Sequence, residues 1–110
     1  MTTEEISQKE AELTAKYQRT VTAHIFSVPN GEDAVLFLRN PDKATKMYAL
    51  DKSMDSFSHA AQFLFEASVV REESDARFFT DKEQDEDLQM GALMKCQELV
   101  KFAIADTKKK

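Results

Sequence analysis

The side chains that could carry a reaction in this chain are few: two histidines and one cysteine. His24 lies in a stretch with strand-like alternation and His59 in a stretch with helical spacing. Neither has a cysteine or a second histidine at the spacing of a metal site. Cys96 falls on an apolar helical stripe, so we expect a buried core cysteine and not a nucleophile paired with a distant histidine. The sequence therefore predicts neither a metal site nor a Cys–His catalytic pair.

Carboxylates are the other candidate chemistry, and they gather in the first turns of the last predicted helix. Glu83, Asp85, Glu86 and Asp87 imitate a cation site, but they lack the glycine and the ligand spacing of a calcium loop. We interpret them as the solvated start of a helix, where acidic side chains complement the positive end of the helix dipole. The chain has two glycines, too few for a glycine-rich phosphate loop. We expect a protein that is not an enzyme and that holds no cofactor.

The composition predicts one domain spanning residues 1–110 and argues against two classes of partner. The formal net charge is −5, and the only cluster of basic residues in the sequence is Lys108 to Lys110, whereas a nucleic-acid binder needs a basic face. No apolar run approaches the roughly 20 residues of a membrane helix, and the N-terminus is acidic where a signal peptide is basic. We therefore expect a cytoplasmic protein that binds neither nucleic acid nor membrane.

The first element predicted along the chain is a helix over residues 3–17. Thr2 and Glu5 have the spacing of a capping box, in which each side chain bonds the backbone N–H of the other residue. The helix carries a thin apolar stripe of Ile6, Leu13 and Tyr17. A stripe this narrow indicates a surface helix that is mobile or used to meet a partner.

Residues 20–39 predict a β-hairpin. From Val21 to Phe26 the side chains alternate with the period of a strand. Asn30-Gly31 suits a turn that needs positive φ, and an apolar return strand follows. Two strands alone are marginally stable, so the hairpin must pack on helices or pair across a subunit interface.

Three helices are predicted to follow, at residues 41–52, 56–68 and 81–106, with a basic tail at 107–110. The first helix should turn Ala44, Met47, Tyr48 and Leu50 inward. The second should bury Phe57, Ala60, Ala61, Leu64 and Phe65. The third has a stripe of Leu88, Ala92, Cys96, Leu99 and Ala103. The prediction is therefore an α+β domain with an N-terminal helix, one β-hairpin and three helices packed against it.

Each of these three helices has a start signal in the sequence. Asn40 before Pro41 predicts an N-cap, because proline favours extended backbone in the preceding residue and suits the first helical position. Asp55 is the predicted cap of the second helix. Thr80 with Glu83 predicts a capping box for the last.

Some apolar side chains fall outside the predicted core and form a candidate protein-contact surface. Phe63 lies off the inward stripe of its helix, and the last helix has more apolar face than one neighbour can cover. This broad face and the unpaired edges of the hairpin predict a homo-oligomer. The candidate contact residues are Ile25, Phe26, Phe63, Leu93, Val100 and Ile104.

Five short motifs give the chain a resemblance to a known family. They are Lys16-Tyr17, Arg39-Asn40-Pro41, the AAQFLF segment from Ala60 to Phe65, Val69-Val70 and Leu99-Val100. In this order, between about Lys16 and Ala105, the chain resembles the small tail assembly chaperones of long-tailed phages and prophages, in particular the Bacteroidetes-type group.

The resemblance implies an assembly function without catalysis. Proteins of this family bind and solubilise the tape measure protein in the host cytoplasm, help to recruit the tail tube protein, and are absent from the mature virion. The resemblance also implies a longer second form made by ribosomal frameshifting near Lys108. Two alternatives stay open: another phage or mobile-element protein, such as a head–tail connector or a host-factor inhibitor, and a small enzyme.

Overall fold

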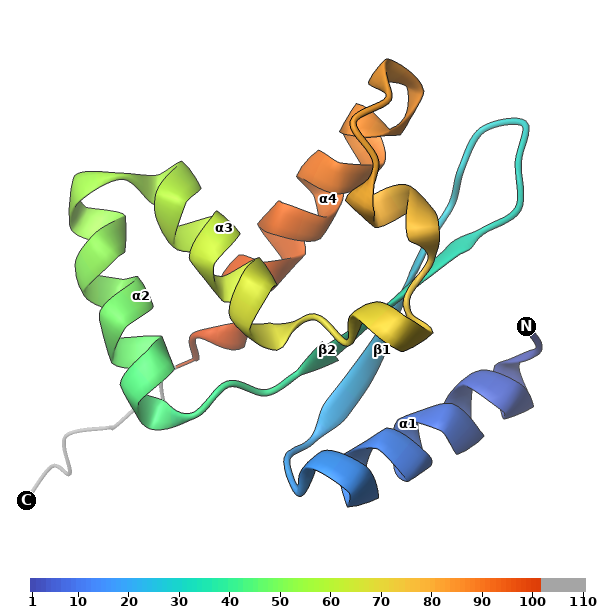
Figure 1. Ribbon diagram of the computed structural model, residues 1–110, viewed down its shortest axis with the longest axis horizontal. Helices are drawn as coiled ribbons and strands as arrows, with labels where there is room; N and C mark the ends of the chain where they lie inside the picture. Colours follow the sequence, from blue (N-terminus) through green and yellow to red (C-terminus); the bar gives the residue numbers. More distant parts are fainter. Residues whose placement is uncertain (102–110) are drawn as a thin grey trace, which may run out of the picture.

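The computed structural model describes residues 1–101 of the chain, in which helices pack around a β-hairpin (Figure 1). Helix α1 (Thr3–Tyr17) precedes strands β1 (Val21–Phe26) and β2 (Ala34–Arg39), which pair antiparallel. The later helices are α2 (Lys43–Asp55), α3 (Phe57–Ser68) and α4 (Glu86–Cys96). Short 3₁₀ turns lie at Arg71–Glu73, Ala76–Phe79, Glu83–Asp85 and Gln97–Leu99. The predicted α+β fold, with its N-terminal helix, hairpin and three packing helices, is confirmed.

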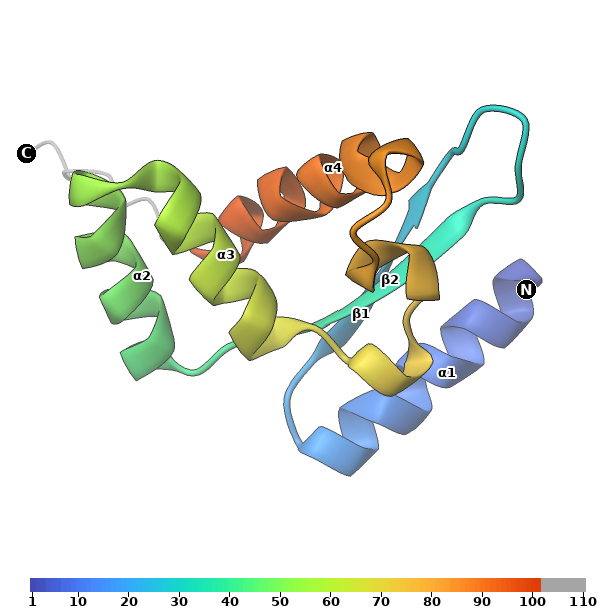
Figure 2. The same cartoon turned by 45° about the horizontal axis from the view of Figure 1, so that its top comes forward.

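The hairpin separates two cores, with α1 on one side of the strands and α3 and α4 on the other (Figure 2). Successive side chains of a strand point to opposite faces, and Leu36, Phe37 and Leu38 of β2 are each at most 1% exposed. Leu36 and Leu38 join the helical core, whereas Phe37 joins the core beneath α1. The uninterrupted apolar run in the sequence therefore reflects a strand that is buried on both faces.

Helix α1 begins as predicted, and its apolar stripe packs on the hairpin. The Thr2 hydroxyl accepts the Glu5 N–H at 3.1 Å, and the Thr2 N–H donates to Glu5 Oε1 at 2.7 Å, which completes the capping box. Ile6 and Leu13 are buried against the hairpin face that carries Phe37. The thin stripe predicted from the sequence is therefore the surface that docks α1.

Both edges of the hairpin are largely covered, so the prediction of unpaired edges is wrong. On the outer edge of β2, Phe37 O accepts the Val70 N–H at 2.9 Å, and further bonds come from the segment that follows α3. On the outer edge of β1, the Val21 N–H donates to Thr14 Oγ1 at 3.0 Å and the Ala23 N–H to Glu10 Oε2 at 2.6 Å. Side chains of α1 thus satisfy amides that an added strand would need. Self-association stays a prediction, but it does not follow from open edges.

The starts of α2 and α3 each lie one or two residues later than predicted. Asp42, not Asn40, caps α2, because its Oδ1 accepts the Thr45 N–H at 2.8 Å while Pro41 is buried before the helix. Helix α2 then continues through Asp55, and the extended residue is Ser56, whose hydroxyl accepts the His59 N–H at 3.4 Å. The predicted Asp55 cap is therefore wrong.

The last helix is shorter than predicted within the described residues. A 3₁₀ turn at Glu83–Asp85 leads into α4, and Thr80 Oγ1 donates to Asp85 Oδ2 at 2.5 Å in place of the expected bond with Glu83. A second 3₁₀ turn at Gln97–Leu99 ends the helical backbone. Several predictions concern residues outside the described part of the chain: Ile104, the remainder of the predicted 81–106 helix, the 107–110 tail and the frameshift site near Lys108.

Candidate protein-binding surfaces

The residues considered for catalysis sit in dissimilar surroundings. Cys96 is buried in the core of α3 and α4, where burial raises the pKa of its thiol to about 12. His59 is exposed on α3. His24 is half-buried on β1, its Nε2 lacks a hydrogen-bond partner, and burial followed by nearby Lys95 lowers its pKa. Cys96 is thus held as a neutral core thiol, and His24 is held in its neutral form.

The acidic run before α4 is not wholly solvated. Asp85 is 6% exposed and accepts the Thr80 hydroxyl, which corrects its interpretation as part of a solvated helix start. Glu83, Glu86 and Asp87 are exposed as expected. Within residues 1–101, no group of three or more histidine, cysteine or acidic side chains is arranged to hold a metal ion.

The outer face of α2 exposes a run of large apolar side chains. Met47 is 57%, Leu50 43% and Met54 84% exposed, and Phe57, the first residue of α3, is 50% exposed. The prediction that Ala44, Met47 and Leu50 point inward is therefore wrong, and so is the burial of Phe57. Tyr48 is 52% exposed and so is not buried as predicted, although its ring does lie against Phe63 of α3. The buried residue of α2 is Ala49, because a small side chain lets α2 lie close against α3.

Helix α4 presents a second pair of exposed apolar side chains. Met90 and Met94 are one helical turn apart and are 58% and 57% exposed, whereas Ala92 and Cys96 on the opposite side are fully buried. The sequence did contain this signal, because both methionines lie off the stripe that was assigned to the core.

The predicted contact residues do not form one surface. Ile25 is 56% exposed on β1. Phe26 is half-buried, with its ring 5.5 Å from that of Phe78, and Phe63 packs on Tyr48 with ring centroids 4.5 Å apart. Leu93 and Val100 are half-buried against the helical core. The exposed apolar area of the helices is instead supplied mainly by methionines.

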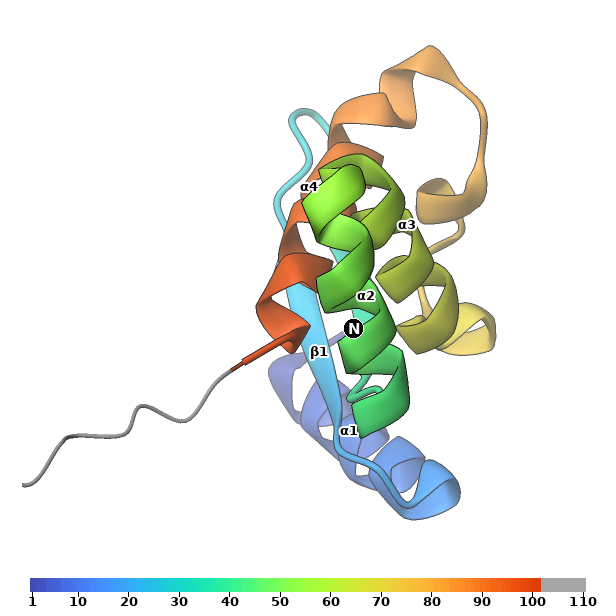
Figure 3. The ribbon, with the colours of Figure 1, turned by 90° about the vertical axis from the view of Figure 1, so that its left-hand side faces the viewer.

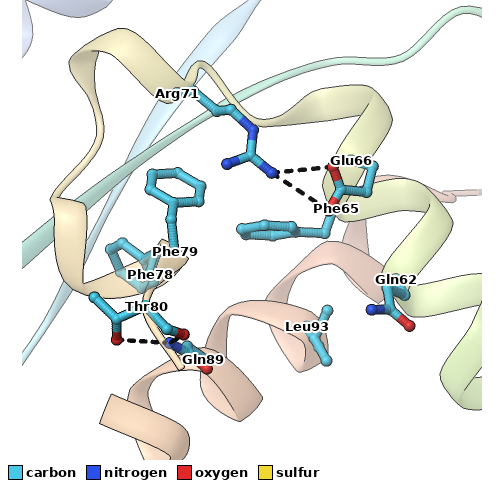
Figure 4. A pocket seen from close by; sticks show the side chains of 9 residues that line it. All are labelled: Gln62, Phe65, Glu66, Arg71, Phe78, Phe79, Thr80, Gln89 and Leu93. Carbon is cyan, nitrogen blue, oxygen red and sulfur yellow. Dashed lines mark hydrogen bonds and ion pairs between the residues drawn. The ribbon is translucent and has the colours of Figure 1, made fainter. Parts of the chain in front are cut away.

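A hollow of about 250 Å³ lies between α3, α4 and the turn at Ala76–Phe79 (Figure 4). Its apolar lining is Phe65, Phe78, Phe79 and Leu93. At its rim Arg71 pairs with Glu66 at 3.1 Å, and its guanidinium lies 4.4 Å from the centroid of the Phe79 ring.

The polar groups of this hollow are largely engaged with one another. Gln89 Nε2 donates to the Thr80 carbonyl at 2.6 Å (Figure 4). It also donates to the Arg77 carbonyl at 3.1 Å, and the two bonds tie α4 to the preceding turn. The residues that line the hollow come from separate parts of the chain, from Gln62 on α3 to Leu93 on α4. The hollow can accept an apolar side chain, but it presents no activated nucleophile or general base.

The comparisons with known proteins found no relative of this chain. The chain matches no protein-family model, no curated protein and no solved structure. In residues 1–101, every helix is too short or too polar to cross a membrane.

Proposed function

We propose that this protein is a phage or prophage tail assembly chaperone that binds an apolar client, the tape measure protein, and keeps it soluble. One observation carries the proposal: all five methionines of the chain are exposed, by 57% to 84%. Methionine belongs to the residues most often found inside proteins, so a chain that places none of its methionines in the core is unusual.

Exposed methionine suits a binder of long apolar segments. Its side chain is unbranched and polarisable, and it adapts to differently shaped partners, which is why methionine is frequent at surfaces that bind many sequences. The net charge of −5 also supports the proposal, because an acidic protein that coats an apolar client adds charge to the complex.

Met90 and Met94 on α4 are the client-binding residues in this proposal. They share one face of a regular helix and are bordered by the exposed carboxylates of Asp87 and Glu98. An apolar segment laid along this face would cover both methionines while the acidic border stays in water. The tape measure protein is assigned as the client from the family resemblance of the sequence motifs, together with recruitment of the tail tube protein.

The test is co-expression with a tape measure protein, which the proposal expects to be encoded beside this gene. Wild-type protein should co-purify with the client and keep it in the soluble fraction. Met90→Glu/Met94→Glu should lose the client, because a charged side chain must be desolvated at the interface. Asp87→Asn, a change at the polar border of the same helix, should retain it.

Two outcomes would overturn the proposal. One is a tape measure protein that stays soluble without this protein. The other is a folded wild-type protein that leaves the tape measure protein insoluble. Co-purification with a head or connector protein in its place would identify the alternative, a head–tail adaptor.

A further inference from the structure

The outer face of α2 has the spacing of a helix-pairing seam. Met47, Leu50 and Met54 are separated by three and then four residues along the helix. This is the alternation by which two helices pack side by side in a coiled coil. All three side chains are between 43% and 84% exposed.

This seam points away from the rest of the described molecule. Ala49 is buried and Tyr48 packs on Phe63 of α3, so these residues mark the inner side of α2. In Figure 3, which views the molecule from the α2 end, α2 lies in front of α3 and α4. Another helix can therefore approach the seam from outside without moving the described elements.

Two opposite charges flank the seam at positions that determine which helix fits. Lys46 directly precedes Met47, and Asp51 directly follows Leu50. In heptad terms, with the two methionines at the a positions and Leu50 at d, Lys46 is a g residue and Asp51 the e residue of the following heptad. In a parallel helix pair, such g and e side chains of the two helices lie opposite each other.

We propose that a second copy of this chain covers the seam, with the two α2 helices side by side and parallel. Lys46 of each copy then pairs with Asp51 of the other, which gives two ion pairs related by the two-fold axis. An antiparallel arrangement would place the Asp51 flanks of the two copies together, and like charges would oppose it. The charge pattern is therefore complementary between two copies in the parallel orientation.

Helix α2 has 13 residues, which gives a short seam, so the dimer should be in concentration-dependent equilibrium with the monomer. Met90 and Met94 do not belong to this seam and stay available for the client. The dimer covers Met47 and Met54, whereas client binding is assigned to Met90 and Met94, so the two proposals are tested on different residues.

The experiment is sedimentation velocity over a dilution series of the full chain and its charge variants. Wild-type protein should double in mass at the upper end of the series. Lys46→Asp and Asp51→Lys should each stay monomeric, because each creates two repulsive pairs. An equimolar mixture of the two variants should dimerise, as should the double variant, because both restore opposite charges across the seam.

Lys52→Asp is the matched control, since it makes the same charge change on the α2 face beside Tyr48 and His59. It should dimerise like the wild type. Lys46 is half-buried, so if Lys46→Asp disturbs the circular dichroism spectrum, exposed Asp51→Lys and the double variant carry the comparison. A wild type that is monomeric throughout the series, or an Asp51→Lys variant that dimerises like the wild type, would overturn the proposal.

Discussion

A matched pair of leucine substitutions distinguishes the buried face of α3 from the exposed face of α2. Leu64 of α3 is 1% exposed and belongs to the core with Phe65, Ala92 and Cys96, whereas Leu50 of α2 is 43% exposed. Leu64→Ala removes buried methyl and methylene groups and leaves a cavity, at a cost of about 2–5 kcal/mol in the free energy of unfolding. Leu50→Ala removes surface that water already reaches, and alanine favours helix slightly, so the expected change is within about 0.5 kcal/mol.

The measurement is urea unfolding followed by circular dichroism, at a concentration low enough to keep the protein monomeric. Both variants should keep the wild-type dependence of free energy on urea, so that a shift in midpoint reports stability. In heating experiments Leu64→Ala should lower the melting temperature by at least about 8 °C, since about 1 kcal/mol corresponds to roughly 4–8 °C in a domain near this size. A loss below about 1 kcal/mol for Leu64→Ala, or an equal loss for Leu50→Ala, would refute this assignment of the two faces.

Three further predictions concern two buried titratable groups and the hydrogen bond from the outer edge of β1 to α1. The folded-state pKa of His24 lies below its ordinary value of 6.5, so on acidification the unfolded chain takes up a proton at this residue before the folded chain does. Lowering the pH from neutral to about 5 should therefore destabilise the wild type more than His24→Gln, measured as the shift of the urea midpoint. Cys96 should react with a thiol reagent such as DTNB only under unfolding conditions, and rapid labelling of the native protein would contradict its burial. Glu10→Ala should speed hydrogen exchange at the Ala23 amide, whereas Glu10→Gln, which keeps an acceptor oxygen, should preserve more of the protection.

The elements that could be predicted from the sequence are those whose signals are local. The capping box of Thr2 and Glu5 needs only two residues at a fixed spacing. The alternation from Val21 to Phe26 similarly predicts strand β1, and the apolar face of α3 around Leu64 is wide enough to identify its buried side.

Helix α2 shows why other features could not be predicted. The apolar residues of α2 lie mostly on one face of the helix, and the usual assumption that an apolar face is buried places Met47 and Leu50 inside. The structure buries Ala49, because packing against α3 depends on close approach of the helices and not on hydrophobicity alone. An exposed apolar face and a buried one look the same in the sequence, so the candidate surface was assigned to other residues.

The hydrogen bonds that cover the edges of the β-hairpin also could not be predicted from local sequence patterns. Glu10 and Thr14 of α1 accept the outward amides of β1, and a separate segment after α3 pairs with β2. These bonds join residues that are adjacent only after the chain has folded, and glutamate or threonine on a helix surface gives no sign of such a partner. The hollow lined by Phe65 and Phe79 depends on tertiary packing in the same way.

The most direct test of the proposed methionine-mediated binding is an NMR titration with ¹³C-methyl-methionine protein. The chain has five methionines, so each methyl signal can be assigned by single substitution to leucine. On addition of a soluble fragment of the tape measure protein, the signals of Met90 and Met94 should shift saturably, while that of Met1 should not. Binding that leaves the Met90 and Met94 signals in place, or saturating additions of the fragment that move none of the five, would contradict the account.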